Sequence, residues 1–310
     1  MTSSHDLPLA VTMGDPAGCG PQITLRAWQT LSREAGASPF YVIADPALFG
    51  SDGETIGSPA AAASVFSSKL PVLALDEALP KFTTGSPDRA LAPAILQSID
   101  RAMADTFAGR AGAVVTNPIS KAVLYSAGFA HPGHTEYLAD LAHKETGEVT
   151  PPVMMLVGGG IRVALATIHV PLMRVLDHLT PPKLEHVIRT TARAMTRDFG
   201  IDAPRIGLTG LNPHAGESGT IGLEERDIIN PVADRLSAEG IDVSPARPAD
   251  TIFAEMLDGR FDAIIAMTHD QGLIPVKTLD LWGGVNTTLG LPVIRTSPDH
   301  GTAYDAAASD

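Results

Sequence analysis

Short apolar runs alternate along this 310-residue chain with segments that have the period of an amphipathic helix. The repeat Leu91, Ile95, Ile99 and Met103 predicts one such helix, because residues four apart share a helix face. Further helices are expected from Pro21, at 180–199 and at 223–239. The runs that predict buried strands are 7–13, 40–44, 113–116, 205–209 and 261–267. This alternation is typical of an α/β fold with a mostly parallel sheet.

Two details modify this pattern. The runs 153–157 and 161–167 are joined by three glycines, and they predict an antiparallel hairpin. The segment 51–70 is rich in Ala, Ser and Gly and is expected to be an irregular surface excursion. The length suggests about two domains. We expect two α/β lobes, with the chain crossing between them more than once and no boundary marked by composition.

Composition excludes several classes of protein. The single cysteine, Cys19, rules out an internal disulfide framework. A net charge of −13 argues against nucleic acid or an anionic membrane as the main partner. No apolar run has the roughly 20 residues of a membrane helix, and residues 1–10 have no signal-peptide pattern. We therefore expect a cytoplasmic protein.

Familiar nucleotide and hydrolase motifs are missing from the sequence. It contains no G-x-G-x-x-G, P-loop, H-E-x-x-H or G-x-S-x-G motif, and no cysteine pair for zinc. What remains is a set of polar segments, each at the end of an apolar run. The first, residues 14–21, is a Gly-rich loop that either makes a tight turn or lets the backbone approach a ligand.

The second segment, residues 131–136, precedes a helical pattern. One interpretation is that Thr135 is simply the N-cap of this helix. The other is that the helix N-terminus, with His134 and Thr135, binds an anion.

Three histidines follow separate strands: His169, His214 and His269. The carboxyl ends of parallel strands converge at one edge of a sheet, and three imidazoles with an open position form a familiar catalytic zinc arrangement. Separations of 45 and 55 residues match no local metal motif, so the spacing alone leaves a structural role open.

Lys277, Asn286 and Arg295 form a further candidate set near the C-terminus. In so acidic a chain, a lysine and an arginine among apolar residues suggest a clamp for phosphate or carboxylate, with structural salt bridges as the alternative. The polar stretch 297–305 is expected to be a loop.

Taken together, these segments resemble the 4-hydroxythreonine-4-phosphate dehydrogenase family of vitamin B6 biosynthesis. The motifs that carry the resemblance span nearly the whole chain in the expected order: G-D-P-A-G-x-G-P (14–21), T-N-P-I-x-K (116–121), G-H-T-E-Y-L-A (133–139), L-N-P-H-A-G-E (211–217), H-D-Q-G-L-I-P-V-K (269–277) and G-V-N-x-T-L-G-L-P-x-x-R-T-S-P-D-H-G-T-A (284–303). Two positions depart from the family pattern, Cys19 and Thr268, and neither is a proposed ligand.

The resemblance implies an isopropylmalate-dehydrogenase-like fold with two lobes and an interlobe cleft, in a homodimer. It implies a divalent metal, Zn²⁺ first and otherwise Mg²⁺ or Co²⁺, on the equivalents of His169, His214 and His269, with His269 from the partner subunit. The implied substrate is a small phosphorylated four-carbon acid. The implied substrate-binding residues are His134, Thr135, Lys277, Asn286 and Arg295, and those facing the adenosine of NAD or NADP are Asp299, His300, Gly301 and Thr302.

The implied reaction is oxidation of the substrate C3 hydroxyl with hydride transfer to the nicotinamide, then loss of CO₂ from the 3-oxo acid. The metal acts as a Lewis acid on that hydroxyl. Lys277 and Asp270 are both candidates to accept the hydroxyl proton. The product is 3-amino-2-oxopropyl phosphate.

Four alternatives stay open at this point. A sister enzyme could act on 4-phospho-D-threonate or 4-phospho-D-erythronate, and a second relative oxidises an aromatic cis-dihydrodiol dicarboxylate. Three histidines with Glu217 nearby could also build a metal-dependent hydrolase, with Glu217 activating water. A metal-dependent binding protein without turnover is the fourth alternative.

Overall fold

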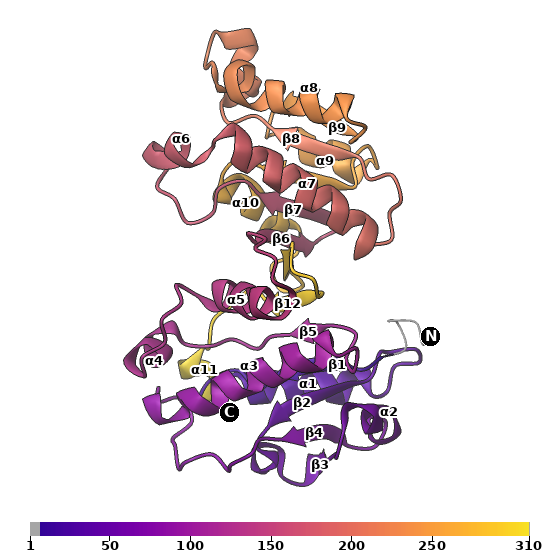
Figure 1. Ribbon diagram of the computed structural model, residues 1–310, viewed down its shortest axis with the longest axis vertical. Coiled ribbons are helices and arrows are strands. Elements are labelled where there is room, and N and C mark those ends of the chain that lie inside the picture. Colours follow the sequence, from indigo (N-terminus) through magenta and orange to yellow (C-terminus); the bar gives the residue numbers. More distant parts are fainter. Residues whose placement is uncertain (1–6, 310) are drawn as a thin grey trace. The chain divides into compact units, whose positions relative to one another are not determined.

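The computed structural model describes residues 7–309. These residues form two compact units (Figure 1). Unit 1 contains residues 7–150 and 291–309, and unit 2 contains residues 151–290. The chain thus leaves unit 1 once and returns to it once, and the C-terminal segment completes the unit that the N-terminal segment begins.

The sheet of unit 1 is parallel throughout, with the strand order β3-β4-β2-β1-β5-β12. Its strands are β1 (Leu9–Thr12), β2 (Phe40–Ala44), β3 (Gly53–Thr55), β4 (Leu70–Ala74), β5 (Val114–Val115) and β12 (Arg295–Pro298). The return of the chain places Arg295 beside Val114 in register. Residues about 180 positions apart in sequence therefore share one edge of this sheet.

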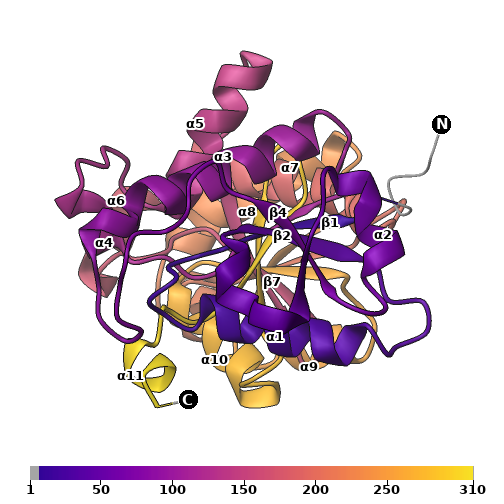
Figure 2. The same ribbon diagram turned by 90° about the horizontal axis from the view of Figure 1, so that it is seen from below.

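Helices cover both faces of the unit 1 sheet, and Figure 2 shows α1 and α3 on opposite sides of β1, β2 and β4. The helices are α1 (Gly20–Leu31), α2 (Ala62–Val65), α3 (Ala92–Phe107), α4 (Lys121–Ser126), α5 (His134–Thr146) and α11 (Tyr304–Ala307). The apolar repeat that predicted α3 is confirmed, since Leu91, Ile95, Ile99 and Met103 are all buried in the core.

The sheet of unit 2 is mixed, with the order β11-β6-β7-β10-β8-β9. Its strands are β6 (Val153–Gly158), β7 (Ile161–Leu165), β8 (Ile206–Thr209), β9 (Val243–Arg247), β10 (Ala263–Ala266) and β11 (Val285–Leu289). The pairs β6/β7 and β6/β11 are antiparallel, which confirms the predicted hairpin, and the pairs β7/β10, β10/β8 and β8/β9 are parallel.

Side chains on the two faces of this sheet alternate along each strand. Met155 and Ala164 belong to the core that includes α7 and α8, whereas Leu156 and Val163 belong to the core that includes α9 and α10 (Figure 1). The helices are α6 (Val175–His178), α7 (Pro181–Arg197), α8 (Asn230–Ala238), α9 (Ile252–Leu257) and α10 (His269–Leu279). Burial on both faces of the sheet explains why these strands are continuous apolar runs in the sequence.

Three sequence expectations were wrong in detail. Residues 51–70 are not irregular throughout, since they contain β3 and α2. The expected helix at 223–239 is divided into a π-helical turn, η7 (Glu225–Ile229), and α8. The polar stretch 297–305 is only partly a loop, because β12 ends at Pro298 and α11 starts at Tyr304.

Within residues 7–309, no helix has the length and apolar character needed to cross a membrane.

Candidate active site

A buried arginine is the most unusual charged group of unit 1. Arg295 begins β12 and is 4% exposed. Its Nε and Nη2 atoms donate to the Thr116 hydroxyl over 3.0 and 2.6 Å, and Thr116 is itself fully buried. Burial lowers the pKa of Arg295 to about 10, so the guanidinium is still charged at neutral pH. Keeping a cation in this place costs free energy unless an anion or dipoles compensate it.

His134 lies near this arginine at the start of α5. The N-cap of the helix is Gly133, so Thr135 is the second helical residue and is not an N-cap. The His134 Nε2 atom is buried and has no hydrogen-bond partner among residues 7–309. Burial holds the pKa of His134 well below its ordinary value, and the charge of Arg295 lowers it further.

A neutral imidazole, a buried guanidinium and the N–H groups at the start of α5 form a site suited to an oxyanion. An unpartnered buried nitrogen costs free energy and is explained by a ligand that supplies its partner. Unit 1 therefore brings together His134 and Arg295, two of the expected substrate-binding residues, and Thr135 follows His134 in the first turn of α5.

Sequence reasoning missed two residues of unit 1 that support the site around His134 and Arg295. Thr116 positions the guanidinium of Arg295, as described above. Asn117 is buried, and its Nδ2 donates to the Thr12 carbonyl at 2.8 Å and the Thr24 hydroxyl at 2.7 Å. The T-N-P-I motif supplied a signal, but it does not reveal that its first two side chains face other parts of unit 1.

The Gly-rich loop 14–21 packs against the segment predicted to face the cofactor. The Cys19 N–H donates to the Thr302 carbonyl at 2.8 Å. A Cβ on Gly18 would lie 2.7 Å from that same carbonyl oxygen. His300 and Gly301 are exposed, and a Cβ on Gly301 would meet only open space. The loop 299–302 thus has one side fixed to unit 1 and another side open to a ligand.

Asp15 and Tyr304 anchor this arrangement. The Tyr304 hydroxyl donates to Asp15 Oδ2 at 2.6 Å, and the Ala17 N–H donates to Asp15 Oδ1 at 3.0 Å. Asp15 is fully buried, and burial raises the pKa of its carboxyl. Burial and then the bond to Asp15 raise the pKa of Tyr304 to about 12. The bond holds α11 and the preceding loop to the end of β1.

In unit 2, two of the three predicted metal-binding histidines are neighbours. His169 follows β7 and is exposed, and His269 is the first residue of α10, after β10. The two ring centroids are 5.6 Å apart. The adjacency of the parallel strands β7 and β10 accounts for this, because both residues leave the same edge of the sheet.

His214 lies on another exposed segment of unit 2, η6 (Pro213–Gly219), and does not join this pair. Its Nδ1 is 2.9 Å from Glu217 Oε2, and its side chain is 68% exposed. Among residues 7–309, no three His, Cys, Asp or Glu side chains lie close enough together to hold a metal ion. One chain therefore presents a pair of imidazoles that suits Zn²⁺ in donor type, and completing the set requires another ligand.

The other candidates of unit 2 lie on α10 and β11. Asp270 Oδ1 is 2.8 Å from His269 Nδ1, and a carboxylate there favours the tautomer that leaves Nε2 free to bind a metal. Lys277 is exposed on α10, and Asn286 is half-buried on β11.

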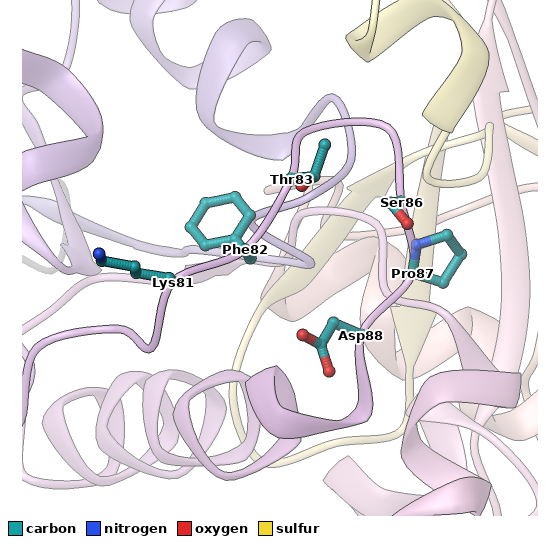
Figure 3. A pocket seen from close by; sticks show the side chains of 6 residues that line it. All are labelled: Lys81, Phe82, Thr83, Ser86, Pro87 and Asp88. Atoms are coloured by element: carbon teal, nitrogen blue, oxygen red, sulfur yellow. The ribbon is translucent and has the colours of Figure 1, made fainter.

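A cavity of about 250 Å³ also opens in unit 1, on the segment between β4 and α3 (Figure 3). It is lined by Lys81, Phe82, Thr83, Ser86, Pro87 and Asp88. None of the residues singled out in the sequence lines it, and the segment is largely exposed. We therefore do not assign the chemistry to this cavity.

Comparison with known proteins decides the family. The family model described as "Pyridoxal phosphate biosynthetic protein PdxA" matches residues 37–310. The chain belongs to this family. A 4-hydroxythreonine-4-phosphate dehydrogenase of Methylorubrum populi is 50% identical to it, over 98% of this chain and 90% of the relative.

Solved structures agree with this membership of the PdxA family. The crystal structure of a 4-hydroxythreonine-4-phosphate dehydrogenase from Klebsiella pneumoniae superimposes with a TM-score of 0.84 at 35% identity, covering 98% of this chain and 94% of that one. A terephthalate 1,2-cis-dihydrodiol dehydrogenase from Burkholderia xenovorans gives a TM-score of 0.66 at 27% identity, covering 98% and 92%. The chain is thus more similar to the relatives named for the phosphorylated substrate, and the predicted resemblance and fold class are confirmed.

Proposed function

We propose that this chain oxidises 4-hydroxythreonine 4-phosphate at C3 with NAD or NADP, and that the 3-oxo acid then loses CO₂ to give 3-amino-2-oxopropyl phosphate. The observation that carries this proposal is the buried cation Arg295 beside the unpartnered imidazole of His134 at a helix N-terminus. Such a site suits a phosphate group, and the PdxA relatives are named for a phosphorylated substrate.

In this proposal Arg295, His134 and Thr135 hold the phosphate. The guanidinium is already oriented by Thr116, so little of its freedom is lost when the anion binds. His134 stays neutral at physiological pH because burial lowers its pKa, and it can therefore donate one hydrogen bond without adding a second cation. Lys277 and Asn286 of unit 2 are the remaining proposed contacts to the substrate.

The proposed metal ligands are His169, His214 and His269. The adjacent rings of His169 and His269 in one chain support two of these assignments, and they argue against the expectation that His269 comes from the partner subunit. Within residues 7–309, the third ligand, His214, does not lie with this pair. We propose that a homodimer completes the set. A bound divalent cation, with Zn²⁺ our first choice, would lower the pKa of the substrate hydroxyl.

The two candidate bases have different surroundings. The Asp270 carboxylate already faces the His269 ring, which suits it to orient that ring. We therefore assign Asp270 to positioning His269 and propose that Lys277, as its neutral amine, accepts the hydroxyl proton. The open side of Asp299, His300, Gly301 and Thr302 is the proposed contact for the cofactor adenosine, which would complete a nicotinamide site without a G-x-G-x-x-G motif.

Exposed apolar side chains in unit 2 support the proposed homodimer. Met173 is 96% exposed and Trp282 is 93% exposed, and large apolar groups are usually covered where a stable partner binds. The absence of a cysteine pair is in keeping with a cytoplasmic location, which we also propose.

The deciding experiment offers the purified protein with Zn²⁺ and NAD⁺ or NADP⁺ to a panel of phosphorylated four-carbon acids. The readouts are absorbance of the reduced nicotinamide and release of CO₂. We expect turnover with 4-hydroxythreonine 4-phosphate and not with 4-phospho-D-threonate or 4-phospho-D-erythronate. Turnover with only 4-phospho-D-threonate or 4-phospho-D-erythronate would instead assign the sister reaction to this chain. Product without nicotinamide reduction would favour the hydrolase, and binding without product would favour the binding protein.

A further inference from the structure

The segment that carries His214 has an uncommon backbone conformation. His214, Ala215, Gly216, Glu217 and Ser218 all have positive φ, at 53°, 52°, 78°, 46° and 56°. Only one of these five residues is glycine, and side chains of L-amino acids disfavour this region. A left-handed turn of this kind persists only where its surroundings hold it, and such strain is concentrated at functional sites.

A buried carboxylate lies directly beneath this turn. Glu225, the first residue of η7, is 3% exposed. Its Oε1 accepts the Asn212 backbone N–H at 2.7 Å, and its Oε2 accepts the Asn212 Nδ2 at 3.0 Å. The same Nδ2 also donates to Glu224 Oε2 at 2.7 Å, so the backbone N–H bond is the one that Glu225 makes alone. Both oxygens are therefore used to fix the residue that precedes the turn.

The turn itself is fitted closely to this carboxylate. A Cβ on Gly216 would lie 2.5 Å from Glu225 Oε2, so the glycine is needed here for space as well as for its φ of +78°. The Ala215 N–H donates to the Asn212 carbonyl at 3.1 Å, which links the fixed residue to the turn. Glu225 thus acts on the His214 backbone through Asn212 and through contact with Gly216.

We infer that Glu225 is the positioning residue of His214: its carboxylate holds Asn212 and supports the left-handed turn that presents the imidazole. The inference rests on the proposed function, because it takes His214 to be a metal ligand. A carboxylate suits this role since it only accepts hydrogen bonds, and both groups of Asn212 that face it are donors. Groups that orient metal ligands typically change metal affinity by about 10-fold to 100-fold when they are altered.

The test is Glu225→Gln in the full-length protein, with Zn²⁺ affinity measured by calorimetry and the absorption spectrum recorded with Co²⁺. The glutamine keeps one acceptor and turns an NH₂ group toward Asn212. We expect Zn²⁺ affinity to fall by about 10-fold and the Co²⁺ spectrum to change. We also expect faster hydrogen exchange at residues 214–218 without metal. Gly216→Ala disturbs the same contact from the other side and should give the same results.

Asp262→Asn is the matched control. Asp262 accepts three hydrogen bonds from Arg205 at the opposite ends of the strands, so this variant loses stability without reaching the turn. Its Zn²⁺ affinity and Co²⁺ spectrum should equal those of the wild type. If Glu225→Gln does not fold, Gly216→Ala decides the question.

His214→Ala separates the two possible failures. If His214→Ala leaves Zn²⁺ affinity unchanged, the ligand assignment in the proposed function is wrong. If His214→Ala weakens Zn²⁺ binding while Glu225→Gln and Gly216→Ala match the wild type in affinity and spectrum, the positioning role is wrong and the proposed function stands. Equal losses in Asp262→Asn would also overturn the inference, because general destabilisation would then account for them.

Discussion

Replacing Arg295 with alanine should weaken binding of the phosphorylated substrate much more than binding of the nicotinamide. Arg295 is 4% exposed, and Thr116 fixes its orientation. A hydrogen bond to a charged group contributes about 1.5–3 kcal/mol in such surroundings. Because each 1.4 kcal/mol is a factor of ten, the KM for the substrate should rise by about 10-fold to 150-fold.

The assay is the initial rate of nicotinamide reduction at saturating metal, with substrate and cofactor varied in turn. Inhibition by inorganic phosphate gives an independent readout of the anion site, and its inhibition constant should rise in parallel. Arg110→Ala is the control, since this half-exposed arginine of unit 1 pairs with the buried Asp105 and does not contact Arg295 or Thr116. Arg295→Lys keeps the charge but not the planar fork, so its KM should fall between those of alanine and the wild type.

Two results would refute this reasoning. A substrate KM within about twofold of the wild type, with unchanged phosphate inhibition, would show that Arg295 does not bind the anion. Equal increases in both KM values would point to a general disturbance of unit 1. Circular dichroism and a denaturation curve identify the second case, because removal of the guanidinium leaves the buried Thr116 hydroxyl without this partner.

Three further outcomes follow from the structure. The pKa of His134 is lowered in the folded state, so this residue's contribution to stability is present above about pH 6.5 and is lost as pH falls below that value, by up to about 1.4 kcal/mol per pH unit. Denaturation measured from pH 7.5 to pH 5 should show a shallower loss of stability in His134→Gln than in the wild type. Equal slopes of stability against pH would contradict this. Gly14→Ala should destabilise the fold by about 2–4 kcal/mol, because φ is +72° and the new Cβ would lie 2.6 Å from Asn117 Cβ. Urea denaturation measures this change in the free energy of unfolding, and a loss below about 1 kcal/mol would show that the loop can relax. Mixed subunits of inactive His169→Ala and inactive His214→Ala should regain part of the activity if the partner supplies His214 to the His169–His269 pair. No recovery after proven subunit exchange would count against a shared site.

The sequence predicted the elements whose periodicity is strong. The stripe from Leu91 to Met103 and the hairpin around Gly158 are both found as expected, because burial of one or both faces imposes a regular pattern. It also predicted that polar motifs follow strands, and His169 and His269 do leave neighbouring strands at one edge.

Contacts between distant segments could not be predicted from the sequence. Nothing in the motif around Thr116 indicates that its hydroxyl accepts from a guanidinium 179 residues away. The left-handed turn at 214–218 was missed for another reason: four of its five residues have side chains that do not signal positive φ. Glu225 resembles any acidic residue in the first turn of a helix, and only its burial beneath Gly216 distinguishes it.

The Gly-rich loop shows how a motif can serve a ligand without touching it. One interpretation of residues 14–21 is that they bring the backbone close to a ligand, but the close approaches found are to the chain itself, at Asn117 for Gly14 and at Thr302 for Gly18. These glycines let two other segments pack against the end of β1. One of those segments is the loop proposed to face the cofactor. A larger residue at position 18 should therefore weaken nicotinamide binding by displacing Thr302, and leave phosphate binding at Arg295 unchanged. Direct titration of each ligand against Gly18→Ala distinguishes this indirect role from a loop that touches the substrate, for which both affinities would fall together.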